Sequence, residues 1–371
     1  MRSRPSYRPD IDGLRAISAG AVVLFHAQVP GFGGGFVGVD VFFVISGYLI
    51  TQVLLASSNQ TARHRLAEFY LRRCRRVLPA LLVGLLIATP IAALVLTPQD
   101  LATYGKYLSS TSVLLTNVVA WTDHSGGWPA LVHLWTISVE EQFYLVYPLV
   151  LLAACRTRAV QTTLLIGALC AVSFALSVWA SYAAPGANFY LAPPRAWELL
   201  LGALLVLTRW RVRSGLATEF TAIAGLLVIA AAVCMYSSKT RYPGVYALPV
   251  CLAAAALLAT GHRRTLVSRL LSVRALVFTG LISYSLYLWH AVILVLFWSW
   301  NGAPPDVFQT VLVLAAIFAI SVVNWRFVER PLRSGVWFKS NRHFLIAAAI
   351  LNFALGAVGF LLWKVLSAFT K

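Results

Sequence analysis

The segment Asp10-Ile-Asp-Gly-Leu-Arg-Ala-Ile-Ser-Ala-Gly-Ala-Val-Val-Leu-Phe-His26 is apolar enough for a membrane-spanning helix, yet it carries an arginine and a histidine. Arg15 and His26 are eleven residues apart, about three helical turns, so both side chains would lie on one face. At about 1.5 Å per residue they would be roughly 16 Å apart, about half the hydrocarbon thickness of a bilayer. Ionisable side chains within a membrane are costly and usually line a polar pathway or a reaction site. Alternatively, Arg15 extends to the membrane interface and His26 only ends the helix.

The composition of the whole chain indicates a polytopic membrane protein. Its 371 residues are 60% hydrophobic and 11% charged, and the mean hydropathy is +0.78; this is too apolar for a soluble domain with one core. Apolar runs long enough to cross a bilayer lie at 14–29, 36–56, 77–97, 139–155, 162–181, 193–208, 216–236, 244–260, 275–298, 307–325 and 343–366. We therefore predict an all-α fold with about 10–11 transmembrane helices. The more polar stretch 101–121 is predicted to be a re-entrant or interfacial helix.

The basic residues predict the topology. Of the 30 lysines and arginines, 24 fall in alternate connecting segments that lie on the cytoplasmic side if the N-terminus is cytoplasmic. The other six are Lys106, Arg195, Lys239, Arg241, Lys364 and Lys371. This asymmetry is the pattern of the positive-inside rule, so we predict a cytoplasmic N-terminus. The net charge of +18 is then mainly a topology signal, and we expect no nucleic-acid partner.

Cysteine usage and the N-terminus exclude some other possibilities. The five cysteines show no Cys-x-x-Cys pair and no metal-ligand spacing, so we expect neither a disulfide framework nor a metal site. The first apolar run has no Ala-x-Ala-like cleavage site and ends in His26, which argues against a cleaved signal peptide.

Asp40 follows a glycine-rich turn at the start of the second predicted span. Glycines allow backbones to approach closely, so we expect Asp40 on the outer side at a depth similar to that of His26. A carboxylate beside an imidazole orients the ring and favours its charged form, which suits a general base. A purely structural Asp–His hydrogen bond is the alternative.

Four arginines lie within five residues after the second span, at Arg72, Arg73, Arg75 and Arg76. Because a guanidinium binds phosphate through two parallel hydrogen bonds, this cytoplasmic cluster suits a ligand with several phosphates. Anchoring to anionic lipid headgroups is the alternative interpretation.

The segment 133–144 brings acidic and imidazole groups to a predicted outer membrane entry. Glu140 and Glu141 are adjacent carboxylates, which are costly at that position unless they face a polar cavity. His133, Glu140 and Tyr144 have the spacing i, i+7 and i+11 of one helical face.

Two further segments place polar side chains at membrane depth. Arg195 and Glu198 have the i,i+3 spacing of an ion pair at the outer end of the sixth span. Ser283, Tyr287 and His290 share a face of the ninth span. Each group alone is compatible with interhelical hydrogen bonding or an aromatic belt. Together they would place the acidic and histidine residues in the outer half of the membrane and the arginine cluster inside, as a site bridging two compartments requires.

Seven motifs occur in a fixed order between residue 8 and about residue 335. They are Arg-x10-His (Arg15, His26), Gly-Val-Asp-Val-Phe-Phe-Val-Ile-Ser-Gly (38–47), Arg-x-x-Arg (Arg73, Arg76), Trp-Thr-Ile-Ser-Val-Glu-Glu-Gln-Phe-Tyr (135–144), Arg-x-x-Glu (Arg195, Glu198), Ser-Tyr-Ser-Leu-Tyr-Leu-Trp-His (283–290) and Val-Glu-Arg-Pro (328–331). In this order they resemble the acyltransferase-3 family of integral membrane acyltransferases. One departure is visible, because Thr136-Ile137 stands where the family usually has Ser-Leu.

The resemblance implies transfer of an acyl group, commonly acetyl, from cytoplasmic acyl-coenzyme A to a hydroxyl of an extracytoplasmic glycan. Typical acceptors in the family are lipopolysaccharide O-antigen, peptidoglycan, exopolysaccharide and antibiotic sugars. On this basis Arg15, Arg72, Arg73 and Arg76 are expected to bind the phosphates of coenzyme A. His26 is expected to act as general base toward the acceptor hydroxyl, and an acyl-imidazole intermediate on His26 is the competing role.

The resemblance also implies roles for the remaining polar residues. Asp40 or Glu140 is expected to orient the imidazole of His26. The side chains expected to contact the oxyanion or the acceptor sugar are Ser283, Tyr287, His290, Arg195, Glu198 and Tyr144.

The resemblance assigns residues 1–335 to an acyltransferase-3-like transmembrane domain and residues 336–371 to an additional C-terminal transmembrane helix. The form of the N-terminal motifs is similar to the subgroup that carries a C-terminal SGNH-type hydrolase domain outside the membrane. We therefore expect a periplasmic SGNH-type partner, or such a domain absent from this sequence, to complete transfer. The expected location is the cytoplasmic membrane of a bacterium, where membrane lipids, acyl-CoA and a glycan acceptor are the partners.

Two other functions remain as alternatives. A transporter or flippase for a glycan or lipid-linked substrate would also have many spans with buried polar groups, but it predicts broken helices in paired repeats and no inverted repeat is visible. A membrane scaffold for a partner enzyme does not account for the cost of placing Arg15, His26, Asp40 and Glu140 at membrane depth.

Overall fold

The computed structural model describes residues 7–56, 61–123, 127–210, 212, 215–303 and 305–369. Within these ranges the regular structure consists of helices, and no β-strand occurs. The predicted all-α fold of a multi-pass membrane protein is therefore confirmed. Five basic residues used to predict the topology (Arg2, Arg4, Arg211, Arg213 and Lys371) lie outside the described residues.

Each of the eleven predicted spans overlaps a helix. These helices are α1 (Pro9–His26), α2 (Gly38–Ala56), α3 (Ala62–Val95), α6 (Trp135–Ala154), α7 (Ala159–Ala183), α9 (Ala196–Thr208), α10 (Gly215–Met235), α11 (Ala247–Thr260), α14 (Ser283–Asn301), α15 (Val307–Asn324) and α17 (Asn341–Phe369). Among the described residues, eight helical segments are long and apolar enough to cross a membrane. The helices α9 and α11 are shorter but apolar. The start of α1 carries Asp10, Asp12 and Arg15, which lower its hydropathy.

Two predicted segments differ from the structure in detail. The run 275–298 is divided into α13 (Arg274–Leu281) and α14. The division follows Gly280, a poor helix former, which lies against the backbone of Asp12. The stretch 101–121 is covered by α4 (Pro98–Ser112) and α5 (Thr116–Thr122). Its interfacial position stays a prediction.

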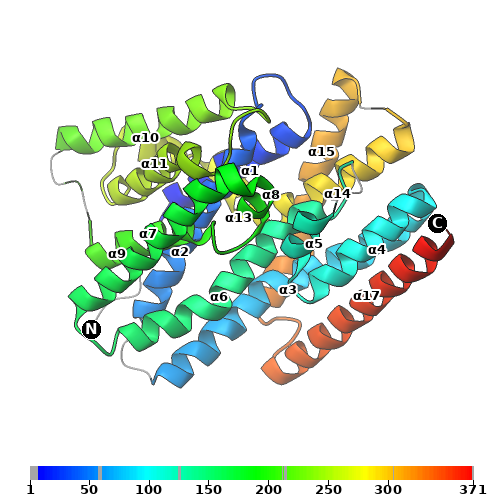
Figure 1. Ribbon diagram of the computed structural model, residues 1–371, viewed down its shortest axis with the longest axis horizontal. Helices are drawn as coiled ribbons and strands as arrows, with labels where there is room; N and C mark the ends of the chain where they lie inside the picture. Colours follow the sequence, from blue (N-terminus) through cyan, green and yellow to red (C-terminus); the bar gives the residue numbers. More distant parts are fainter. Residues whose placement is uncertain are drawn as a thin grey trace. The chain divides into compact units, whose positions relative to one another are not determined.

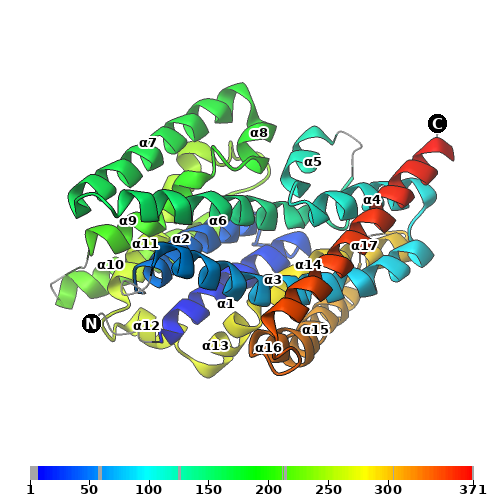
Figure 2. The same ribbon diagram turned by 90° about the horizontal axis from the view of Figure 1, so that it is seen from below.

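The helices divide into two compact units. The first consists of Met1–Leu66 and Gln142–Ser283, and the second of Ala67–Glu141 and Tyr284–Lys371. In the second unit α4 and α17 lie side by side (Figure 1, Figure 2). The two helices approach closely at Gly105 and Gly359, since a Cβ on Gly105 would lie 2.6 Å from the Gly359 carbonyl oxygen.

In the first unit, glycines join α2 closely to α9. A Cβ on Gly47 would lie 1.8 Å from the carbonyl oxygen of Leu199, and a Cβ on Gly202 would lie 2.0 Å from that of Val44. Real Cβ atoms do not approach a carbonyl oxygen this closely, so any larger residue at either position requires the helices to separate. These contacts fix the start of α2, with Asp40, relative to the start of α9.

We expect Gly47→Ala to lower the thermal unfolding temperature of the purified protein, because overpacking a tight contact typically costs about 1–3 kcal/mol. Gly20→Ala is the matched control, since Gly20 lies in α1 and a Cβ there would meet no atom within 4 Å among the described residues outside the adjacent backbone of its own helix. Alanine in an open helical position is neutral or slightly stabilising. Equal unfolding temperatures for Gly47→Ala and wild type would contradict the described packing.

Candidate functional site

The helix α1 carries Arg15 and His26 without interruption. It begins with Pro9 at its first position and Asp10 and Asp12 in its first turn, which suit the N-terminal end of a helix. His26 is its last residue, half-buried, with its ring centroid 5.0 Å from that of Phe25. The eleven-residue spacing therefore places Arg15 and His26 on one face of a single helix, about 16 Å apart along its axis.

Arg15 is hydrogen-bonded to Ser283. Its Nη2 donates to Ser283 Oγ at 3.0 Å, and Ser283 is only 1% exposed. This contact corrects the expected position of Ser283, because the hydroxyl lies at the level of Arg15 near the start of α1, eleven residues from His26. Ser283 is thus beside the residue expected to bind the acyl donor, and not in the outer half where the acceptor was expected.

Asp40 lies deeper along α1 than the sequence predicted. A Cβ on Gly35 would meet the Ala21 carbonyl oxygen at 2.1 Å, and a Cβ on Gly38 would meet that of Ser18 at 2.3 Å. The two segments therefore run antiparallel, so Asp40, two residues beyond Gly38, lies near the level of Ala16. That level is ten residues, or about 15 Å, from His26 along α1.

The partner of Asp40 is a guanidinium. Arg195 Nη1 lies 3.2 Å from Asp40 Oδ1 and 3.0 Å from Glu198 Oε1, and the three side chains are between 0% and 1% exposed. The predicted Arg195–Glu198 ion pair is therefore confirmed, whereas the carboxylate that was expected to orient His26 pairs with Arg195. We call Asp40, Arg195, Glu198 and Cys251 the Arg195 cluster.

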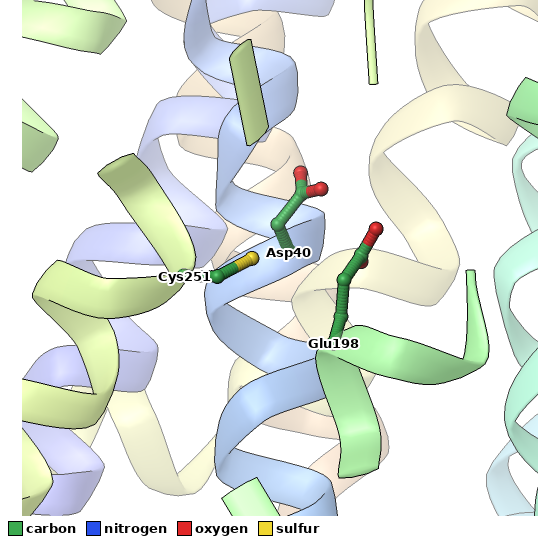
Figure 3. Close-up of side chains that lie close together, drawn as sticks. All are labelled: Asp40, Glu198 and Cys251. Atoms are coloured by element: carbon green, nitrogen blue, oxygen red, sulfur yellow. The ribbon is translucent and has the colours of Figure 1, made fainter. Parts of the chain in front are cut away.

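Figure 3 shows the side chains of Asp40 from α2, Glu198 from α9 and Cys251 from α11 directed toward one another. One potential metal-ligand atom of each lies within 4.8 Å of the others. The Arg195 guanidinium already contacts both carboxylates, so a metal ion here would lie next to a positive charge. The arrangement thus suits a buried ion-pair cluster better than a metal centre.

The four arginines of the expected phosphate site lie within α3, and they differ in exposure and in partners. Arg72 is exposed and forms an i,i+4 ion pair with Glu68. Arg75 is buried and donates to the carbonyl oxygens of Leu332 at 3.0 Å and Phe338 at 2.9 Å, and to Asn341 Oδ1 at 2.8 Å. Arg75 therefore holds the connection that precedes α17. Arg76 is half-buried and interacts electrostatically with Glu141.

Arg73 is held by two adjacent carboxylates from α6. Its Nε lies 2.6 Å from Glu141 Oε1 and its Nη2 lies 3.0 Å from Glu140 Oε2, with side-chain exposures of 16–18%. The sequence prediction placed Arg73 inside and Glu140 outside, and the ion pairs show that this separation was wrong. The reason is that α3 begins at Ala62 and not near residue 77, so Arg73 lies about 16 Å into the helix. Glu140, which was expected to orient His26, thus has Arg73 as a partner.

Tyr287 and His290 belong to a buried imidazole cluster with His133 in the second unit. The Tyr287 hydroxyl donates to the His133 carbonyl at 2.9 Å and lies 2.7 Å from Thr136 Oγ1. His290 Nδ1 donates to the Tyr287 carbonyl at 2.6 Å, and His133 Nε2 donates to the Leu288 carbonyl at 3.1 Å. The two imidazole centroids are 5.3 Å apart. The Tyr287 hydroxyl is therefore engaged at the start of α6.

The structure adds residues to the expected set. Glu141 makes the shortest contact to Arg73, and His133 lies in the imidazole cluster. Both occur in the segment 133–144, where the adjacent carboxylates and the helical spacing were visible in the sequence, but neither was assigned a role. Tyr144, expected at the acceptor site, is 3% exposed and its ring packs beside Phe143.

A family model described as an acyltransferase domain (Acyl_transf_3) matches residues 8–326. The peptidoglycan O-acetyltransferase OatA of Listeria monocytogenes is 31% identical over 351 residues, which cover 88% of this chain and 56% of the relative. The putative peptidoglycan O-acetyltransferase YrhL of Bacillus subtilis is 31% identical over 88% of this chain and 55% of its own length. The O-acetyltransferase OatA of Staphylococcus aureus is 29% identical over 89% and 58%. The chain thus spans a little over half the length of these relatives, and no solved structure shows significant similarity to it.

Proposed function

The chain belongs to the acyltransferase-3 family, and from this premise we propose that it moves an acetyl group from cytoplasmic acetyl-CoA to a hydroxyl of an extracytoplasmic glycan. Its location is the cytoplasmic membrane of a bacterium. Because two of the relatives are named as acting on peptidoglycan, peptidoglycan is the first acceptor to test. The relatives are longer than this chain, so a further extracytoplasmic SGNH-type domain or partner completes the transfer in this proposal.

The placement of Arg15 and His26 on α1 is the observation that supports the proposal most. A single helix presents a permanent cation near the end that we predict to be cytoplasmic and an imidazole at its other end, about 16 Å away. A donor with its phosphates at Arg15 and an extended arm along the helix brings a thioester toward His26. The acceptor then needs to enter only the outer half of the membrane.

His26 acts as the general base in this proposal. A neutral imidazole takes the proton from the acceptor hydroxyl as the oxygen attacks the thioester carbonyl. The C–O bond forms, the C–S bond breaks, and the departing thiolate of coenzyme A receives the proton. Imidazole suits both steps because its ordinary pKa lies close to neutral pH.

The ion pairs modify the expected donor site. Arg15 is the arginine that we assign to a donor phosphate, and Arg72 and Arg76 keep the donor-binding role predicted from the sequence. Arg73 is matched by two carboxylates, so its proposed role is to join α3 to the start of α6. The Arg195 cluster is assigned to the stability of the first unit.

The proposal is tested with inverted membrane vesicles from an acetyltransferase-null strain, with and without this protein. Isotope-labelled acetyl-CoA is added outside, at the cytoplasmic face, and the luminal glycans are isolated. We expect base-labile label on the glycans only in vesicles that contain the protein. Label that requires acetyl-CoA inside the vesicles would contradict the proposed direction, and unlabelled glycans with transport of an intact glycan would favour the transporter.

A further inference from the structure

Ser283 contacts the guanidinium of Arg15, whereas the sequence analysis predicted that it contacts the oxyanion or the acceptor sugar. The hydroxyl is 1% exposed and accepts a hydrogen bond of 3.0 Å from Arg15 Nη2, while Arg15 itself is only half-buried. The buried hydroxyl thus restrains one edge of a guanidinium that is still partly accessible. A hydroxyl oxygen orients the guanidinium without adding negative charge, in contrast to the carboxylates that hold Arg73 and Arg195.

Two close contacts of glycines with neighbouring backbone bring Arg15 and Ser283 within hydrogen-bond distance. A Cβ on Gly13 would lie 1.8 Å from the carbonyl oxygen of Leu271, and a Cβ on Gly280 would lie 1.8 Å from that of Asp12. These backbone contacts fix the first turns of α1 against α12 (Leu266–Leu271) and α13. Arg15 follows Gly13 by two residues and Ser283 follows Gly280 by three, so the register brings the two side chains together.

We infer that Ser283 is a positioning residue for Arg15, which it aims at an anionic group of the acyl donor, and that it does not bind the acceptor sugar. The inference rests on the proposed function, in which Arg15 binds a phosphate of acyl-CoA. A freely rotating arginine loses side-chain entropy when it binds a phosphate, and the buried hydroxyl removes part of that cost beforehand. The donor affinity therefore depends on Ser283, while the chemical step at His26 does not.

The test compares wild type, Ser283→Ala and Ser283→Thr for kcat and for the KM of acetyl-CoA and of the acceptor, together with direct binding of coenzyme A. Loss of one hydrogen bond to a charged group is expected to raise the donor KM and the Kd of coenzyme A about 10-fold. We expect kcat and the acceptor KM to change less than about twofold, and threonine to restore most of the donor affinity. Ser18→Ala is the matched control, because Ser18 is also 1% exposed and, within the described part of the chain, its hydroxyl donates to the Leu14 carbonyl of its own helix.

A double-mutant cycle that combines Ser283→Ala with Arg15→Lys tests the inference even if Ser283→Ala alone lowers the protein yield. Non-additive effects of the two changes on the donor Kd support the inference, and additive effects overturn it. If only the acceptor KM changes, Ser283 contacts the acceptor and the inference is wrong. If wild type binds coenzyme A and Ser283→Ala binds it equally well, only this inference fails. If wild type does not bind coenzyme A, the proposed function fails with it.

Discussion

Replacing Arg195 with methionine is expected to destabilise the protein by about 3–5 kcal/mol, the usual cost of removing one partner from a buried ion pair. The change leaves the carboxylates of Asp40 and Glu198, both 0% exposed, without the cation that contacts them at 3.2 Å and 3.0 Å. Neither carboxylate has access to water, so the lost interaction is not replaced by hydration. The measurement is thermal unfolding of the purified protein, together with its level in the membrane.

Two variants separate this effect from the loss of any arginine. Arg241→Met removes an exposed arginine that lies 4.2 Å above the ring of Tyr182 in the same unit, and it is expected to change stability little. The triple variant Arg195→Met, Asp40→Asn, Glu198→Gln removes both uncompensated charges and should recover a large part of the loss. If Arg195→Met and Arg241→Met unfold at the same temperature, the Arg195 cluster does not stabilise the first unit.

The stability and the proposed catalytic roles are carried by different arginines. Arg195 and Arg73 each contact two carboxylates, and such arrangements hold helices together at a high cost of desolvation. Arg15 is oriented by a neutral hydroxyl, so its charge is not reduced by that partner. The difference explains why a cluster of arginines in the sequence does not by itself identify a phosphate-binding site.

The helices were predictable from the sequence because apolar runs of sufficient length determine them. All eleven predicted spans have a helix, and the i,i+3 pair of Arg195 with Glu198 was predictable because both residues belong to one local segment. The contacts of Arg195 with Asp40 and of Arg73 with Glu140 and Glu141 join residues 155, 67 and 68 positions apart. Such contacts depend on how the helices pack, which hydropathy does not encode.

Depth within the membrane was the main source of error. The hydropathy pattern predicted that the third span begins near residue 77, because the preceding turns of α3 carry arginines. It therefore assigned Arg73 to a loop. The helix in fact starts at Ala62. Likewise, the depth of Asp40 depends on which turns of α1 are met by Gly35 and Gly38. Composition alone does not determine how far along α1 Asp40 lies, whereas the glycine contacts determine it directly.

Replacing His26 with alanine is expected to reduce acetyl transfer by about 10²–10⁴-fold, the usual contribution of a general base. The reason is that the acceptor hydroxyl has then no base at the end of α1 to take its proton. The measurement is the amount of base-labile acetyl on cell-envelope glycans in a null strain, normalised to the membrane level of each variant. His64→Ala is the matched control, because His64 is exposed near the start of α3 and should keep the wild-type rate.

Labelling of the wild-type protein separates the two chemical roles of His26. In the general-base route the acyl group passes directly from the donor, so wild-type protein incubated with labelled acetyl-CoA and no acceptor should not retain label on the peptide that contains His26. In the acyl-imidazole route that peptide carries the label until an acceptor arrives. Wild-type rates of transfer in His26→Ala would exclude both routes and move the acid–base chemistry to another group. The buried imidazole cluster of His133 and His290 would then be the next site to test, since among the described residues it holds the two histidines packed closest together.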